Sequence, residues 1–306
     1  MENFKKEHKE TIVSACNLLG LSRQVYYRAL RKRARNQRTA QKVIALVNDV
    51  RRVMRRIGTR KLYHKLEKQL SELNVGRDKL FKILRVNHML IKPKRSYHIT
   101  TDSHHRFRKH KNIVCSVEIN RPEQIWVSDI TYIGTRKNPS YLALITDAYS
   151  KKIVGYNVSQ SLAVEGSFQA LEMALNERNY KDSPLIHHSD RGLKYCSNEY
   201  QALLDKNSIK PSMTEKYDLY ENAIAERING ILKQEFFINK NIQNIELKNI
   251  LVKESIEIYN SFRPHCSNHM LTPNQMHKQN QLRRKTYKSK KSHEGQYLIN
   301  CVSFKK

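Results

Sequence analysis

Residues 121–214 contain the pattern that most restricts the fold. Three runs rich in Trp, Val, Ile, Thr and Tyr follow one another at hairpin distances, which is typical of antiparallel strands. An amphipathic helix, a short apolar strand, a second helix and a short last strand come next. This order predicts an α/β fold in which helices pack on the faces of one mixed, five-stranded sheet.

The first hundred residues have helical periodicity instead. Apolar residues recur at helical spacing on both sides of "LGLS", where Gly20 supplies a tight turn and Ser22 is a good N-cap for the next helix. A helix, a glycine turn and a second, basic helix predict a helix-turn-helix DNA-binding region, with an ordinary helical hairpin as the alternative. The side chains expected to contact DNA from the second helix are Arg23, Gln24 and Arg28.

The net charge points to a polyanionic partner. Lysine and arginine total 57 against 28 acids, a formal charge of +29. Such an excess destabilises a compact chain through self-repulsion, and double-stranded DNA is the first candidate to neutralise it. The sequence contains neither an apolar run of membrane-spanning length nor an apolar segment near its start, and its five cysteines are scattered. We therefore expect a cytoplasmic, nucleoid-associated protein without a membrane partner.

A purely structural role explains three of the acids poorly when they are considered together. Asp129 interrupts the first strand in "WVSDITYI", although aspartate disfavours strands and is costly to bury alone. Asp190 ends the fourth strand, and Glu226 lies on a helix at 221–237, opposite its apolar stripe. Taken alone, Glu226 fits a solvated helix face. Asp147, at another strand end, is interpreted as a turn former or a supporting group.

These residues resemble the three acids of the DDE transposase and retroviral-integrase superfamily. Between Asp190 and Glu226 lie 35 residues, and "YNSFRPHCSNHMLTP" at 259–273 is similar to the "YN-x-x-RPH" signature of bacterial insertion-sequence transposases of the IS-three family. "RQVYYR" and "TTDSHHRFRKHKN" also resemble the N-terminal part of that family's larger, catalytic reading frame. The resemblance covers nearly the whole chain.

The resemblance implies a ribonuclease H-like catalytic core and metal-dependent cleavage and joining of DNA at terminal inverted repeats. In such sites Asp129, Asp190 and Glu226 are both the catalytic and the metal-binding residues, and they hold two Mg²⁺ or Mn²⁺ ions with Asp129 bridging them. It also implies a homo-oligomer on DNA, transposon ends and a target as substrates, and the upstream reading-frame protein as a further partner.

Several side chains near the acids are expected to assist DNA binding. Lys233 lies on the same helix stripe as Glu226 and predicts a phosphate contact, with a solvated lysine as the alternative. His188 and Arg191 flank Asp190 and could steer the scissile phosphate or orient that aspartate. His187 is interpreted as a packed core histidine.

Two other functions remain open at this point. A non-catalytic DNA-binding regulator explains the charge and predicts indifference to the three acids, and a ribonuclease H-like nuclease would cut without joining. The expected organisation is a helix-turn-helix region at 1–50, a second helical DNA-binding module with a basic linker at 51–112, the catalytic core with C-terminal helices at 113–280, and a basic tail at 281–306.

Overall fold

The computed structural model describes residues 11–91, 110–135, 138–161, 163–215, 222–238 and 242–283. The chain divides into two compact units, residues 1–52 with 58–91 and residues 53–57 with 92–306. Most of the expected basic linker and nearly all of the expected basic tail lie outside the described residues, so the sequence-based boundaries stay predictions.

The N-terminal unit is helical. Helix α2 (Ile12–Leu18) is capped by Thr11, and a turn containing Gly20 at φ 63° leads to α3 (Arg23–Val53). The hydroxyl of Ser22 accepts the backbone N–H of Val25, so the predicted N-cap is present. Three further helices follow, α4 (Thr59–Lys65), α5 (Glu67–Glu72) and α6 (Arg77–Val86), and their leucines Leu62, Leu70, Leu80 and Leu84 are buried. The local helix-turn-helix arrangement is therefore present, and its DNA contacts stay a prediction.

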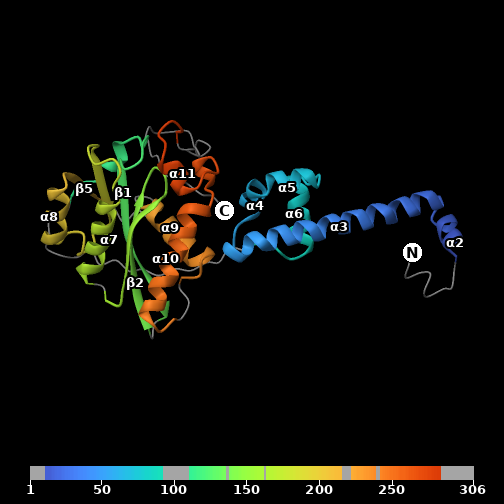
Figure 1. The fold of residues 1–306 in the computed structure, drawn as a ribbon, viewed down its shortest axis with the longest axis horizontal. Helices are drawn as coiled ribbons and strands as arrows, with labels where there is room; N and C mark the ends of the chain where they lie inside the picture. The colour runs from blue at the N-terminus through green and yellow to red at the C-terminus, as the bar shows by residue number, and fades with distance from the viewer. Residues whose placement is uncertain are drawn as a thin grey trace. The chain divides into compact units, whose positions relative to one another are not determined.

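The second unit is built on one mixed sheet of five strands, as predicted (Figure 1). The strands are β1 (Ile125–Thr135), β2 (Asn138–Asp147), β3 (Ile153–Ser159), β4 (Leu185–Ser189) and β5 (Ile209–Met213). Their order is β3-β2-β1-β4-β5, with antiparallel pairing from β1 to β3 and parallel pairing of β1 with β4 and of β4 with β5. This places β1 at the centre, beside β4.

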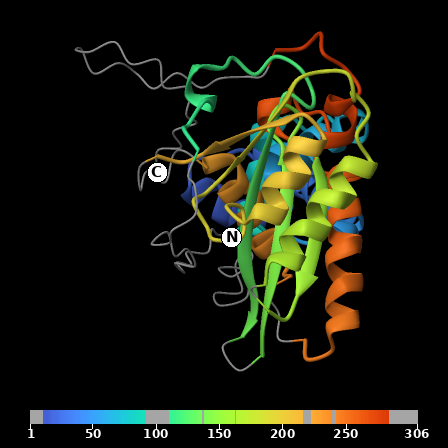
Figure 2. The ribbon, with the colours of Figure 1, turned by 90° about the vertical axis from the view of Figure 1, so that its left-hand side faces the viewer.

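Helices cover both faces of the sheet. Helices α7 (Val164–Asn176) and α8 (Asn198–Lys206) pack on one face around Trp126, as Figure 2 shows from that side. Helices α9 (Ala223–Glu235) and α10 (Ile245–Phe262) cover the other face and bury Ile228, Ile231 and Leu232 against β2 and β3. Because both faces are covered and side chains alternate along a strand, Trp126 of β1 lies under α7 and α8, whereas Asp129 lies on the side of α9.

A buried polar network ties the short C-terminal helix α11 (Pro273–His277) to this unit. Asp147 accepts the backbone N–H groups of Glu123 and Ser150, each at 2.7 Å, so the turn-forming interpretation of Asp147 is confirmed. The two ring nitrogens of His277 contact different acids: Nε2 lies 3.3 Å from Glu123 Oε1, and Nδ1 lies 3.7 Å from Asp147 Oδ1. Among the described residues, no helix is long and apolar enough to cross a membrane.

Candidate active site

The register of β1 and β4 brings two of the three acids together. The last paired residues of the two parallel strands are Val127 and His188. Asp129 lies two residues beyond Val127 in β1, and Asp190 lies two residues beyond His188, directly after the end of β4, so this register brings the two aspartates to neighbouring positions. The two aspartates are 61 positions apart in the sequence, and this distance gives no indication that they lie close together in the fold.

Asp190 also forms the turn that ends β4. Its Oδ1 accepts the backbone N–H of Gly192 at 3.0 Å, which is the local hydrogen bond typical of an aspartate after a strand. A methyl group on Gly192 would meet Oδ1 at 2.9 Å, so any larger residue at that position would displace the carboxylate of Asp190. The turn and the predicted ligand are compatible roles for Asp190, because a carboxylate has a second oxygen.

Helix α9 brings the third acid to β1. Two asparagine amides of α9 donate hydrogen bonds to β1: Asn222 Nδ2 to the Ser128 carbonyl oxygen at 3.1 Å, and Asn229 Nδ2 to Asp129 Oδ2 at 2.6 Å. Glu226 lies between these asparagines, in the first turn of the helix. Both asparagines are buried against the sheet, whereas Glu226, which lies between them in the sequence, is exposed.

Asp129 has the most perturbed carboxyl of the site. Its side chain is partly buried, and this desolvation, together with the negative charges of Asp190 and Glu226, raises its pKa to about 7. The amide of Asn229 opposes the increase by favouring the ionised form. Desolvation of its carboxyl also raises the pKa of Glu226, although the residue as a whole is exposed. Charge from all three acids therefore accumulates around Asp129.

The side chains predicted to bind DNA differ in their surroundings. Lys233 lies in the last turn of α9, where burial lowers its pKa while the charge of Asp129 acts in the opposite direction, so its ammonium group is near the acids. Arg191 is partly buried directly after Asp190. His188 is 1% exposed and its Nδ1 lies 2.9 Å from Ser212 Oγ. This burial contradicts the expected DNA contact of His188, because the ring offers no surface to a phosphate.

His187 is a core histidine, as interpreted from the sequence. Its Nε2 lies 2.6 Å from Ser128 Oγ and 2.9 Å from Tyr200 Oη, on the side of the sheet covered by α8. Burial and the neighbouring His188 lower its pKa to about 3. The ring is therefore neutral and joins β1, β4 and α8.

Sequence reasoning missed the asparagine contacts. The helical periodicity placed Asn222, Glu226 and Asn229 on one stripe, but the stripe was taken as the polar side of α9, and the hydrogen bond of Asn229 to Asp129 was not foreseen. The three-residue spacing of Glu226 and Asn229 puts them one helical turn apart on the same face. That spacing was the available signal.

The donor set fits a hard divalent cation. Carboxylate oxygens are the ligands that Mg²⁺ and Mn²⁺ prefer, and the raised pKa of Asp129 is the response of a carboxyl to uncompensated negative neighbours. Asn229 Oδ1, beside Asp129, is buried and has no hydrogen-bond partner among the described residues. Within the same residues, no three acidic, histidine or cysteine side chains lie close enough to hold a metal. Mutual repulsion of the carboxylates opposes a closer approach.

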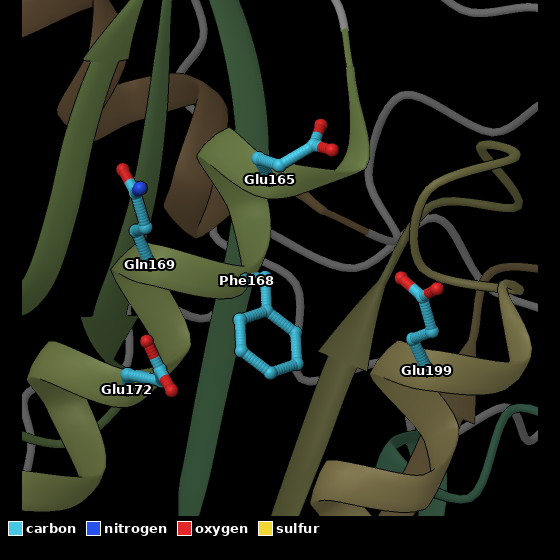
Figure 3. A pocket seen from close by; sticks show the side chains of 5 residues that line it. All are labelled: Glu165, Phe168, Gln169, Glu172 and Glu199. Carbon is cyan, nitrogen blue, oxygen red and sulfur yellow. The ribbon is translucent and has the colours of Figure 1, made fainter.

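A groove elsewhere in the unit does not contain these acids. It has a volume of about 340 Å³ and lies between α7 and α8. Figure 3 shows Phe168 between the two helices, with three glutamates and Gln169 around it. The groove is therefore separate from the site on β1, β4 and α9.

Comparison with protein families gives two matches, both to models described as an integrase core domain. One covers residues 119–218 and the other residues 207–273. Together they span all five strands and the helices from α7 to α10, including the three acids.

Curated relatives come from bacterial insertion elements. The chain is 32% identical over 254 residues to an uncharacterized 31 kDa protein of insertion element IS600 from Shigella sonnei, covering 82% of this chain and 92% of that protein. It is 34% identical over 160 residues to transposase InsF of insertion sequence IS3fB from Escherichia coli, covering 52% and 55% of the two chains.

Solved structures include the HTLV-2 integrase catalytic core domain in complex with magnesium. The identity is 22%, the match covers 51% of this chain and 97% of that chain, and the TM-score is 0.41. The strand order and the integrase core matches confirm the ribonuclease H-like fold expected from the sequence.

Proposed function

We propose that this chain, which belongs to the IS3 family of insertion-sequence transposases, cuts and joins DNA at the terminal inverted repeats of its own insertion sequence. The family consists of DDE-type enzymes with an integrase core. The observation that carries the proposal is that Asp190 from the turn after β4 and Glu226 from α9 come near Asp129 of β1, where desolvation and the charges of these two acids raise the pKa of Asp129.

The three carboxylates are the proposed ligands of two Mg²⁺ or Mn²⁺ ions. Bound there, the ions would stabilise the attacking and leaving oxygens of an in-line displacement at phosphorus. The hydrogen bond from the Asn229 amide favours the ionised form of Asp129, the form that binds a cation. Lys233 supplies a positive charge beside these acids, where a DNA phosphate would enter, and Arg191 offers a second cation next to Asp190.

The same residues serve both chemical steps. In cleavage the attacking oxygen comes from water, and in joining it comes from the 3′-hydroxyl of a DNA end, so neither step requires a protein nucleophile. Double-stranded DNA is the proposed partner, and the charge of +29 supports it. Because two ends must be joined to one target, we expect a homo-oligomer on DNA in the bacterial nucleoid, with the upstream reading-frame protein as an additional partner.

The test is a strand-transfer assay. The full chain is incubated with labelled terminal-repeat DNA and Mg²⁺, and the products are separated by size. Joined products are expected from the wild type and none from Glu226→Gln, whereas Glu254→Gln, which changes an exposed acid of α10, should leave them unchanged. Nicked DNA without joined products would indicate a nuclease, and DNA binding without either product would indicate a regulator. Full activity of Glu226→Gln would refute the assignment.

A further inference from the structure

We propose that Arg263 is a positioning residue for Glu226, acting through its ion pair with Glu235 at the other end of α9. The inference rests on the proposed function of Glu226. It concerns a residue of the "YNSFRPH" segment, which contributes none of the three acids of the site.

The ion pair is buried and bidentate. Arg263 Nε donates to Glu235 Oε2 at 2.8 Å, and Nη2 donates to Oε1 at 2.7 Å. The third nitrogen, Nη1, lies 2.8 Å from His265 Nε2, so all three arms of the guanidinium group are engaged. The side chain of Arg263 is 2% exposed and that of Glu235 is 20% exposed. A lysine has no planar fork and reproduces only one of these contacts.

Arg263 itself is held to the sheet by the residues before it. Tyr259 Oη donates to the carbonyl oxygen of Lys151 at 2.9 Å, next to the start of β3. Asn260 accepts the backbone N–H of Ile153 at 3.0 Å and donates to its carbonyl oxygen at 2.9 Å. These bonds anchor the last turn of α10 to the edge strand, and the Arg263 guanidinium lies over the Tyr259 ring. The contacts of this segment therefore end at the carboxylate of Glu235.

The position of α9 along its axis determines where Glu226 lies. The apolar residues of α9 pack into the core, but apolar packing is non-directional and tolerates small axial shifts. Directional bonds occur at the N-cap and in the middle of the helix, through Asn222 and Asn229 to β1, and at its last residue, through Glu235 to Arg263. Glu235 follows Glu226 by nine residues, about 13.5 Å along a helix, so Arg263 acts on Glu226 only through the helix.

The test compares Arg263→Lys and Glu235→Gln with the wild type in the full chain. Each variant is expected to lower the turnover rate of DNA cleavage about 10- to 100-fold, the effect of misplacing a reacting group by about 1 Å. The KM for terminal-repeat DNA should stay within twofold. The double variant should be no slower than the slower single variant, because both changes remove the same pair. Hydrogen exchange of the α9 amides should be faster, while that of β1 is unchanged.

Matched controls are Arg283→Lys and Glu254→Gln, which make the same chemical changes at exposed positions. Wild-type turnover in both single variants would overturn the proposal. So would multiplicative effects in the double variant, or a loss of DNA affinity that equals the loss of rate. If Arg263→Lys does not fold, Glu235→Gln decides the question alone, because its side chain is more exposed. Full activity of Glu226→Gln would instead refute the proposed function.

Discussion

Replacement of Asp129 by asparagine is expected to abolish catalysis and to stabilise the fold. The ionised carboxyl of Asp129 is partly buried beside two other acids, and its pKa rises from the ordinary value of 3.8 to about 7. Asparagine removes the charge but keeps a side-chain oxygen that can accept the hydrogen bond of Asn229. The substitution therefore removes the repulsion without leaving the Asn229 amide unpaired.

The size of the effect follows from the pKa. At about 1.4 kcal/mol per pH unit, the increase corresponds to about 4 kcal/mol, which is an upper bound. Solvent reaches part of the side chain and screens the three charges, so we expect the free energy of unfolding to increase by about 1–2 kcal/mol at pH 8. Because the folded pKa is above the unfolded one, the penalty in the wild type grows as the pH rises from about 3.8 to about 7, so it is small at pH 4 and nearly complete at pH 8.

Urea unfolding of the core measures this difference. Trp126 is the single tryptophan of the chain and is fully buried in β1, so its fluorescence reports on the second unit. The measurement is made without divalent cations at pH 4 and pH 8. His187, with a pKa lowered to about 3, destabilises the fold as the pH falls below 6.5. This effect is common to both proteins and cancels in their difference.

The control is Asp205→Asn, which removes an exposed acid of α8 and should change the free energy of unfolding by less than about 0.5 kcal/mol. Two results would refute the reasoning. One is an Asp129→Asn variant that is less stable than the wild type at pH 8, and the other is a stabilisation of equal size at both pH values.

Three further predictions concern ligands and packing. Mg²⁺ at a hundredfold excess over its dissociation constant should raise the free energy of unfolding of the wild type by about 2.7 kcal/mol, as measured by Trp126 fluorescence. A chelator should reverse this gain, and the Asp129→Asn variant should not show it. Substituting both Arg23 and Arg28 by alanine should lower the slope of log affinity against log salt by about 1.8 in DNA-binding titrations, and Gln24→Ala, which removes no charge, should leave it unchanged. His277→Ala should cost about 3–5 kcal/mol at neutral pH, because it removes the imidazole that lies against two buried carboxylates and leaves Arg178 as the cation beside Glu123. Retention of most of that stability in urea unfolding would show that water replaces the imidazole.

The alternation of strand and helix patterns was sufficient to predict the mixed sheet of the second unit. Trp126 and Val127 lie in β1, and the apolar run before Asp190 forms β4, because period and composition reflect burial on a covered sheet. The Gly20 turn and the Ser22 cap were also predictable, since both depend on local backbone geometry.

The direction of individual side chains was less predictable. His188 was expected to meet DNA, yet it is buried, because a strand of a sheet that is covered on both faces offers solvent to neither side. Asn229 was placed on the correct stripe of α9 without its partner on β1. Which face of a helix is polar can be read from the sequence, but whether that face meets water or a neighbouring strand cannot.

The sequence by itself determined the identity of the three acids, the 35 residues between the last two, the strand and helix order, and the charge that favours DNA. Only the tertiary structure decided that the register of β1 and β4 brings Asp190 close enough to act on Asp129, and that Arg263 reaches Glu235. The physical reason is that local propensities depend on neighbours in the chain. Register and ion pairing depend on groups that meet only when distant segments bury their apolar faces together.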